Sequence, residues 1–115
     1  MERALIVARM QPSSAAEVAR LFAESDATDL PMVAGTVSRT LLRFHDLYFH
    51  LTEVKSSRAD TIAEIRDHPE FVRLSQQLTE HISPYDPQTW RSPSDAMAHE
   101  FYRWEADRGI VVPEK

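Results

Sequence analysis

Two arginines, a tyrosine and a histidine lie close together near the middle of the chain, at Arg39, Arg43, Tyr48 and His50. A guanidinium stabilises negative charge on an oxygen atom, and a histidine can accept a proton near neutral pH. With a phenolic hydroxyl beside them, these groups suit an oxygen-rich ligand that is neutral or an enolate. These four side chains can act on one ligand only if the secondary-structure elements that carry them bring them close together.

A β-hairpin with a two-residue turn at His45-Asp46 would position all four side chains. The expected pairs are Phe44 with Leu47, Arg43 with Tyr48, Leu42 with Phe49, Leu41 with His50 and Arg39 with Thr52. Opposite partners share a face, and side chains alternate along each strand. One face therefore carries Thr40, Leu42, Phe44, Leu47, Phe49 and Leu51. The other carries Arg39, Leu41, Arg43, Tyr48, His50 and Thr52.

The polar face of this hairpin has two explanations. A sheet face that is covered only by water carries polar residues without any further role. However, the segment 39–52 contains no lysine, and its only acidic residue is Asp46 in the turn. If helices cover one face and a partner chain covers the other, the polar face becomes a half-buried cationic and phenolic patch. We expect it to face the helices, because Asp26 follows the first predicted helix.

The flanking sequence predicts the elements around the hairpin. We expect a strand over 4–10, a helix over 15–24, a loop over 26–31, strands over 33–44 and 47–54, a second helix after Ser56-Ser57 that extends to Ile82, and a strand over 98–105. The order β-α-β-β-α-β predicts an α+β, ferredoxin-like antiparallel sheet with both helices on one face.

Local signals refine this order. Ser14-Ala15-Ala16-Glu17 matches a capping box at the start of the first helix. Pro69 predicts a kink in the second helix. We expect an irregular arm over 83–97 and a flexible tail over 107–115, in which Ile110–Val112 could dock on another surface.

Composition excludes several classes of protein. With 115 residues, we expect a single domain over 1–115. Thirteen basic residues stand against eighteen acidic ones, for a net charge of −5, which argues against nucleic-acid binding. The absence of cysteine excludes disulfides and zinc–thiolate sites, and two glycines are too few for a phosphate-binding loop.

The remaining motif types also give no signal. No two histidines have the spacing of a zinc site, so we expect no metal. The apolar run near the N-terminus is too short for a signal peptide, and no segment could span a membrane. We therefore expect a cytoplasmic protein that binds neither nucleic acid nor membrane.

The stretch Arg39–Leu51, with its Arg-Phe-His-Asp-Leu-Tyr-Phe-His-Leu run, resembles the aromatic polyketide cyclases of the tetracenomycin type. Similar agreement is seen at Arg3–Met10, Asp29–Pro31, Ser83–Tyr85 and Phe101–Trp104. The resemblance covers nearly the whole chain in order.

This resemblance implies a cofactor-free enzyme of bacterial type II polyketide pathways. Such enzymes form homodimers of ferredoxin-like subunits, as dimeric α+β barrels, and they can associate with synthase components. They close a ring in a poly-β-ketone or a partly cyclised intermediate by intramolecular aldol condensation and dehydration.

The resemblance also implies catalytic positions. Arg39 and His50 match the active-site arginine and histidine of the family, and Asp26 matches an acidic residue of the pocket. Ser25 departs from the family pattern, which has a second histidine there. Either His50 or Asp26 would take the proton, and Arg39 would stabilise the enolate.

Further residues are candidates for binding the substrate. They are Arg43, Tyr48, Ser25, Phe22, Trp90, Phe101 and Trp104. The aromatic members could equally be ordinary core residues. They would fold a flexible chain into one reactive conformation and exclude water.

Two other functions are compatible with the same fold. One is a cofactor-independent monooxygenase that oxidises a phenolic polyketide intermediate. The other is a non-catalytic dimeric partner of the synthase complex, which would bias a spontaneous cyclisation. Consumption of oxygen would identify the first, and a stoichiometric requirement for the protein would identify the second.

Overall fold

The structure, a computed structural model, describes residues 2–55, 65–91 and 93–113. Its helices are η1 (Pro12–Ser14), α1 (Ala15–Asp26), α2 (Leu30–Ala34), α4 (Pro69–Leu78) and η2 (Pro93–Ala96), where η marks a 3₁₀ helix. Its strands are β1 (Glu2–Met10), β2 (Thr36–Phe44), β3 (Leu47–Val54), β4 (Ile82–Pro84), β5 (Arg103–Glu105) and β6 (Gly109–Val112). Of the helices described, none is long and apolar enough to cross a membrane.

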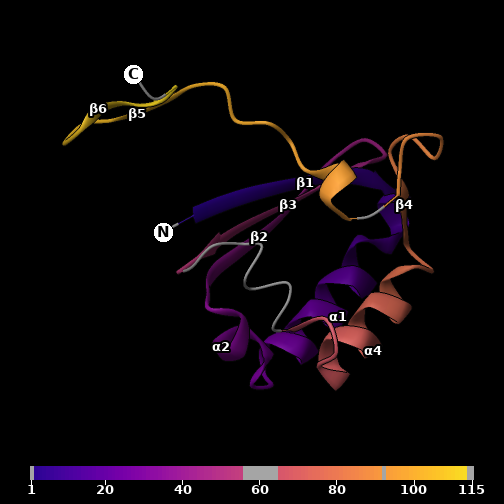
Figure 1. The fold of residues 1–115 in the computed structure, drawn as a ribbon. Coiled ribbons are helices and arrows are strands. Elements are labelled where there is room, and N and C mark those ends of the chain that lie inside the picture. The colour runs from indigo at the N-terminus through magenta and orange to yellow at the C-terminus, as the bar shows by residue number, and fades with distance from the viewer. Residues whose placement is uncertain (1, 56–64, 92, 114–115) are drawn as a thin grey trace.

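A four-stranded antiparallel sheet in the order β2-β3-β1-β4 forms one layer of the fold. Both long helices, α1 and α4, lie against the same face of this sheet (Figure 1). The predicted α+β, ferredoxin-like βαββαβ order is confirmed, with β4 as the last strand of the sheet.

The central hairpin pairs as predicted from the sequence. Phe44 lies opposite Leu47, and the pairing continues through Leu41 with His50 to Arg39 with Thr52. His45 adopts a left-handed conformation with φ 54° in the turn. Because the register is confirmed, the assignment of side chains to the two faces also holds.

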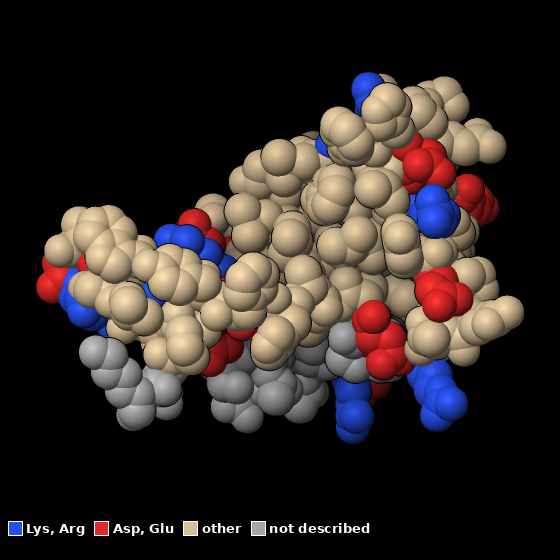
Figure 2. All heavy atoms as spheres, turned by 90° about the horizontal axis from the view of Figure 1, so that it is seen from above, with Lys and Arg blue, Asp and Glu red and all other residues tan. Residues whose placement is uncertain are grey.

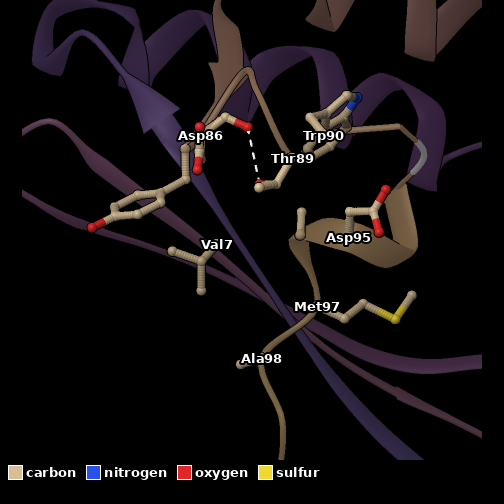
Figure 3. Close-up of a pocket in the computed structure, with 9 residues that line it drawn as sticks. Val7, Asp86, Thr89, Trp90, Asp95, Met97 and Ala98 are labelled. Carbon is tan, nitrogen blue, oxygen red and sulfur yellow. Dashed lines mark hydrogen bonds between the residues drawn. The ribbon is translucent and has the colours of Figure 1, made fainter.

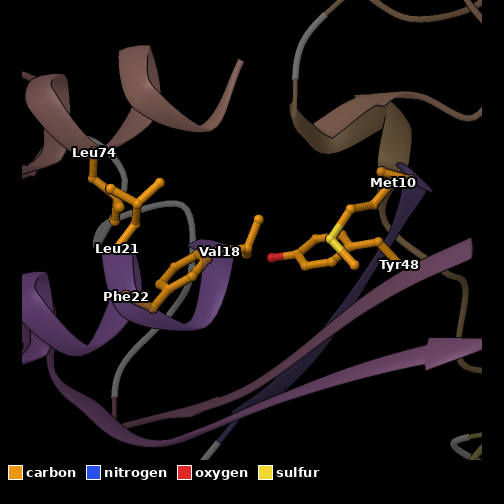
Figure 4. Close-up of a cluster of buried hydrophobic side chains, with 7 residues drawn as sticks. Met10, Val18, Leu21, Phe22, Tyr48 and Leu74 are labelled. Atoms are coloured by element: carbon orange, nitrogen blue, oxygen red, sulfur yellow. The ribbon is translucent and has the colours of Figure 1, made fainter. Parts of the chain in front are cut away.

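The main core lies between the sheet and the helices. It contains the buried residues Ala8, Met10, Val18, Leu21, Phe22, Tyr48 and Leu74. Figure 4 shows Tyr48 and Met10 extending from the strands toward α1, which carries Val18 and Phe22. The face with Arg39, Tyr48 and His50 is therefore the helix-covered face, as expected.

None of the helices in the described part of the chain lies over the opposite face of the hairpin. Leu42 is 48% exposed and Phe44 is 62% exposed, although both are large and apolar. Figure 2, viewed from the side away from α1 and α4, shows a broad central area without charged side chains. We call the residues Thr40, Leu42, Phe44, Leu47, Phe49 and Leu51 the open apolar face.

Strand β2 forms one edge of the sheet, and its start is irregular. The register with β3 shifts between Thr36 and Ser38, so Val37 is an extra residue in β2. Such a β-bulge bends a strand and increases its twist. After the bulge, regular pairing carries Arg39 onto the helix-covered face.

The predicted capping box is wrong. Ser14 precedes α1 in a helical conformation and makes no capping hydrogen bond through its side chain, because the 3₁₀ turn η1 leads directly into the helix. The Ser14 hydroxyl instead contacts His81 Nδ1 at 3.2 Å. Glu17 pairs with Arg20 on the outer surface of α1.

The second strand begins later than predicted, because Val33 belongs to α2. Pro31 lies in the first turn of this short helix, where its missing N–H is not needed. Gly35 ends the helix in the left-handed conformation, with φ 70°, and β2 begins at Thr36. The predicted loop over 26–31 therefore contains the end of α1 and the start of α2.

The predicted kink at Pro69 is also wrong, since Pro69 lies in the first turn of α4. The His68 side chain caps this helix by accepting a hydrogen bond from the Glu70 N–H. The part of the predicted second helix at 56–64 lies outside the described residues. Ile82 is not helical and begins β4.

The predicted last strand over 98–105 is not part of the main sheet. β4 pairs with Ala8–Met10, and Met97 makes an isolated bridge to Ile6, so this edge of β1 is already occupied. β5 instead pairs with β6 in a separate two-stranded sheet that extends away from the main sheet (Figure 1). We call this two-stranded sheet the arm from here on, in distinction from the irregular segment expected over 83–97. β6 lies within the segment that we expected to be a flexible tail.

Candidate active site

An ion pair joins the end of α1 to strand β2. Arg39 Nε lies 3.2 and 3.1 Å from the two carboxylate oxygens of Asp26, and Arg39 Nη2 donates to Oδ1 at 2.9 Å. Asp26 is the last residue of α1, and Arg39 lies on the helix-covered face of the hairpin. The contact fixes the direction of the guanidinium beneath the helix.

The same guanidinium reaches the imidazole on the neighbouring strand. Arg39 Nη1 lies 2.9 Å from His50 Nε2. The Arg39 side chain is only 16% exposed, whereas its partner carboxylate on Asp26 is closer to solvent. The structure therefore brings together all three residues predicted to be catalytic, with Arg39 between the other two.

Two aromatic rings border this group. The buried Phe22 ring lies 5.0 Å from the His50 ring, edge to face, and 4.9 Å from the Arg39 Cζ atom. A cation close to an aromatic face is stabilised by the ring quadrupole. The Tyr48 ring lies 6.3 Å from that of His50. Burial raises the pKa of the Tyr48 hydroxyl well above its usual value, although the positive charge of Arg39 acts in the opposite direction.

Ser25 is fully buried, and its hydroxyl has no hydrogen-bond partner among the residues that the structure describes. It lies one helical turn beyond Phe22 on the inner face of α1 and directly precedes Asp26. An unpaired buried hydroxyl costs free energy, so its presence here calls for a reason.

The other predicted binding residues are not gathered around Arg39. Arg43 shares the helix-covered face, but it lies at the end of the hairpin, where it is exposed and donates to the His45 carbonyl at 3.2 Å. Phe101 is 82% exposed, and both it and Trp104 belong to the segment that leads out along the arm.

Trp90 lines a different cavity, of about 180 Å³. Figure 3 shows this cavity between the loop after β4 and the chain around Met97, with Val7 also lining it. Val7 pairs with Phe49 and so belongs to the sheet face opposite Tyr48 and His50. Sequence reasoning identified Trp90 but missed this cavity, because the irregular segment after β4 has no periodicity to show which face it covers.

Within residues 2–55, 65–91 and 93–113, no group of three or more acidic or histidine side chains could hold a metal ion. The side chains of the Asp26–Arg39–His50 group have a chemistry of their own. The Arg39 guanidinium, paired with Asp26, can polarise a carbonyl or stabilise an enolate oxygen, and the His50 imidazole beside it can exchange a proton.

Comparison with known proteins agrees with this chemistry. A family model described as polyketide synthesis cyclase matches residues 2–105. The chain is 48% identical over 107 residues to polyketide synthase CurG of Streptomyces cyaneus, covering 93% of this chain and 100% of that one. It is 41% identical over 104 residues to tetracenomycin F2 cyclase of Streptomyces glaucescens, covering 90% and 94% of the two chains.

The fold is also similar to a solved structure. The structure of tetracenomycin F2 cyclase from Streptomyces glaucescens, a type II polyketide cyclase, matches this chain with a TM-score of 0.84 at 40% identity. The match covers 92% of this chain and 99% of the solved one.

Proposed function

The chain belongs to the polyketide synthesis cyclase family, and we propose that it closes a ring by intramolecular aldol condensation followed by dehydration. The substrate would be a poly-β-ketone or a partly cyclised intermediate of aromatic polyketide biosynthesis. The observation that carries this proposal is the direct contact of Arg39 with both Asp26 and His50 beneath the helix layer.

The reaction begins with removal of a proton from a methylene group between two carbonyls. His50 accepts this proton, and the electron pair of the C–H bond becomes an enolate whose oxygen is stabilised by Arg39. The enolate carbon then attacks a second carbonyl of the same chain, and the new alkoxide takes the proton back from His50. Loss of a further proton and of the hydroxyl as water completes the dehydration.

Asp26 serves in this scheme to hold Arg39 rather than to take the proton. Both of its carboxylate oxygens accept hydrogen bonds from the guanidinium. Phe22 and Tyr48 form apolar and phenolic walls next to the reacting groups. The unpaired Ser25 hydroxyl is a further candidate for contact with a substrate oxygen.

Replacement of His50 tests this assignment. We expect His50→Gln to lower kcat/KM for ring closure by about 10²-fold, which is typical for the loss of a general base. The control is His45→Asn, which removes an imidazole from the turn and is compatible with its left-handed conformation. A His50→Gln enzyme that forms the native ring pattern at the native rate would refute the proposed base.

The same assay distinguishes the other functions. Ring closure should proceed without oxygen and with many turnovers per protein chain. A requirement for oxygen would identify a monooxygenase instead. A requirement for one protein chain per product, unaffected by the loss of Asp26, Arg39 and His50 together, would identify a non-catalytic partner.

We propose that the chain acts as a homodimer. The open apolar face, with Leu42 and Phe44, and the exposed aromatic residues of the arm support this, because monomers seldom expose contiguous apolar area of that kind. The double variant Leu42→Asp/Phe44→Asp should then sediment as a single 13.2 kDa chain, while the unmodified protein sediments at twice that mass. Val72→Asp, on the exposed surface of α4, is the control.

The proposal includes a cytoplasmic location and contact with components of a type II polyketide synthase. The similarity to polyketide synthase CurG supports such contact. Co-purification of the tagged chain with a ketosynthase from a producing strain would test it, with the open-face double variant as a second bait. If the ketosynthase is absent from both preparations, the cyclase acts on released intermediates.

A further inference from the structure

The contact between Arg39 and His50 determines which imidazole nitrogen carries the proton. Arg39 Nη1 and His50 Nε2 are 2.9 Å apart, which is a normal hydrogen-bond distance. A guanidinium has only donors, so Nε2 must be the acceptor. This assigns a neutral His50 whose proton is on Nδ1.

In this tautomer the free lone pair of the imidazole is on Nε2, which is the atom that accepts the hydrogen bond from Arg39. A general base must offer a free lone pair to the proton that it removes. With Nε2 already accepting from Arg39, His50 cannot take a carbon-bound proton there. In the absence of ligand, the guanidinium therefore blocks the imidazole nitrogen that would act as the base.

We propose, on the basis of the cyclisation above, that Arg39 is a gate: His50 becomes a base only when a ligand oxygen takes the Nη1 hydrogen bond. The ligand class that does this is an enolisable 1,3-dicarbonyl compound. Its carbonyl oxygen accepts from Arg39 while its central methylene lies beside the released Nε2. The proton moves to Nε2, and the resulting enolate oxygen remains hydrogen-bonded to the guanidinium.

The other contacts of Arg39 allow this exchange. Asp26 accepts from Nε and Nη2, so the ion pair persists when the Nη1 contact passes from His50 to a ligand. The Phe22 ring touches both the guanidinium and the imidazole and limits their movement. Arg39 is therefore held in place independently of His50.

Nitrogen-15 NMR of the histidine rings tests the gate on the complete chain near neutral pH. In the ligand-free protein, His50 should show a protonated Nδ1 and an unprotonated Nε2. Addition of 2,4-pentanedione should shift the Nε2 resonance, whereas 2-pentanone, which has one carbonyl, should not. The resonances of His45, in the exposed turn, serve as an internal control.

Three variants make the test specific. Arg39→Met should remove the preference for the Nδ1–H form and the selective response to the dione. Arg39→Lys, which retains a donor, should keep the tautomer, and it remains informative if the methionine variant does not fold. Asp26→Asn should also keep the tautomer, because it leaves the Nη1 contact in place.

A ligand-free His50 protonated on Nε2 would overturn the gate, as would an equal response to the ketone and the dione. Both results are independent of turnover. A chain that responds to the dione but closes no ring would leave the gate intact and refute the proposed function. A chain that closes rings but shows the wrong tautomer would do the reverse.

Discussion

The two faces of the central hairpin differ in a way that reverses the usual distribution of polar and apolar residues. The helix-covered face carries Arg39 and His50, together with the buried Tyr48. The open apolar face presents Leu42 and Phe44 to the surface. The same two strands thus bury Tyr48, partly bury Arg39 and His50, and expose Leu42 and Phe44.

The proposed function assigns a separate role to each face. Buried charges are tolerated when they are paired, and Arg39 has both Asp26 and His50 as partners. Partly burying these groups costs free energy, and the proposed ring closure gives a reason for it, since an apolar face would pack equally well under the helices. The proposed homodimer would cover the exposed apolar residues of the open apolar face.

The largest expected effect that tests the difference between the two faces of the hairpin is on catalysis. Arg39→Met should lower kcat/KM for cyclisation by about 10²–10³-fold, the loss seen when one donor to a developing oxyanion is removed. Arg20→Met is the matched control, because Arg20 lies on the outer surface of α1 and pairs there with Glu17 and Glu24. Steady-state kinetics with both variants decides the outcome: equal rates would mean that the helix-covered face is structural.

The next effect concerns stability and uses two adjacent leucines. Leu41 packs against the core, whereas Leu42 points to the open face. Leu41→Ala should reduce the free energy of unfolding by about 2 kcal/mol at every protein concentration. Leu42→Ala should change it by less than about 0.5 kcal/mol in dilute solution, where the chain is monomeric, and by more at concentrations where the dimer forms.

Urea unfolding at several protein concentrations measures both leucine variants. If the loss of Leu42 is as costly as the loss of Leu41 in the most dilute sample, the two faces do not differ in the way described. If neither variant shows any dependence on concentration, the homodimer is refuted.

The smallest effect is a dependence of stability on alkaline pH. Burial raises the pKa of Tyr48 in the folded chain above 10.0, the value of an unperturbed tyrosine. The unfolded chain then loses this proton first, so the folded state loses stability above about pH 10, by at most about 1.4 kcal/mol per pH unit. Below that pH the contribution of Tyr48 is complete.

Tyr48→Phe should remove this part of the alkaline slope, because phenylalanine does not ionise. The measurement is urea unfolding of both proteins at a series of pH values on either side of the transition. Identical slopes for the two proteins would show that the Tyr48 hydroxyl is not protected by burial on the helix-covered face.

The hairpin could be predicted residue by residue, because a two-residue turn and strict alternation leave only one register. The fourth strand could not. Its three residues, Ile82–Pro84, are too few to show a pattern. Residues 98–105 alternate, but only Arg103–Glu105 form a strand, and that strand pairs with β6. Pro69 was ambiguous, since proline can either bend a helix or begin one.

The candidate site followed partly from the sequence. The register placed Arg39 and His50 on one face, and the resemblance added Asp26. The direct contact between Arg39 and His50 depends on side-chain conformations that no sequence pattern specifies. The sequence also does not show that Trp90 lies away from Asp26, Arg39 and His50, because its position depends on the path of an irregular segment.

The bulge at Val37 also bears on aggregation. β2 is an edge strand of nine residues, and a long, flat, apolar edge is a template on which other chains can add strands. The extra residue bends and twists the edge at its start, which makes it a poorer template. Deletion of Val37 would therefore be expected to favour fibrillar assembly of the chain, even where ring closure and dimer formation are unaffected.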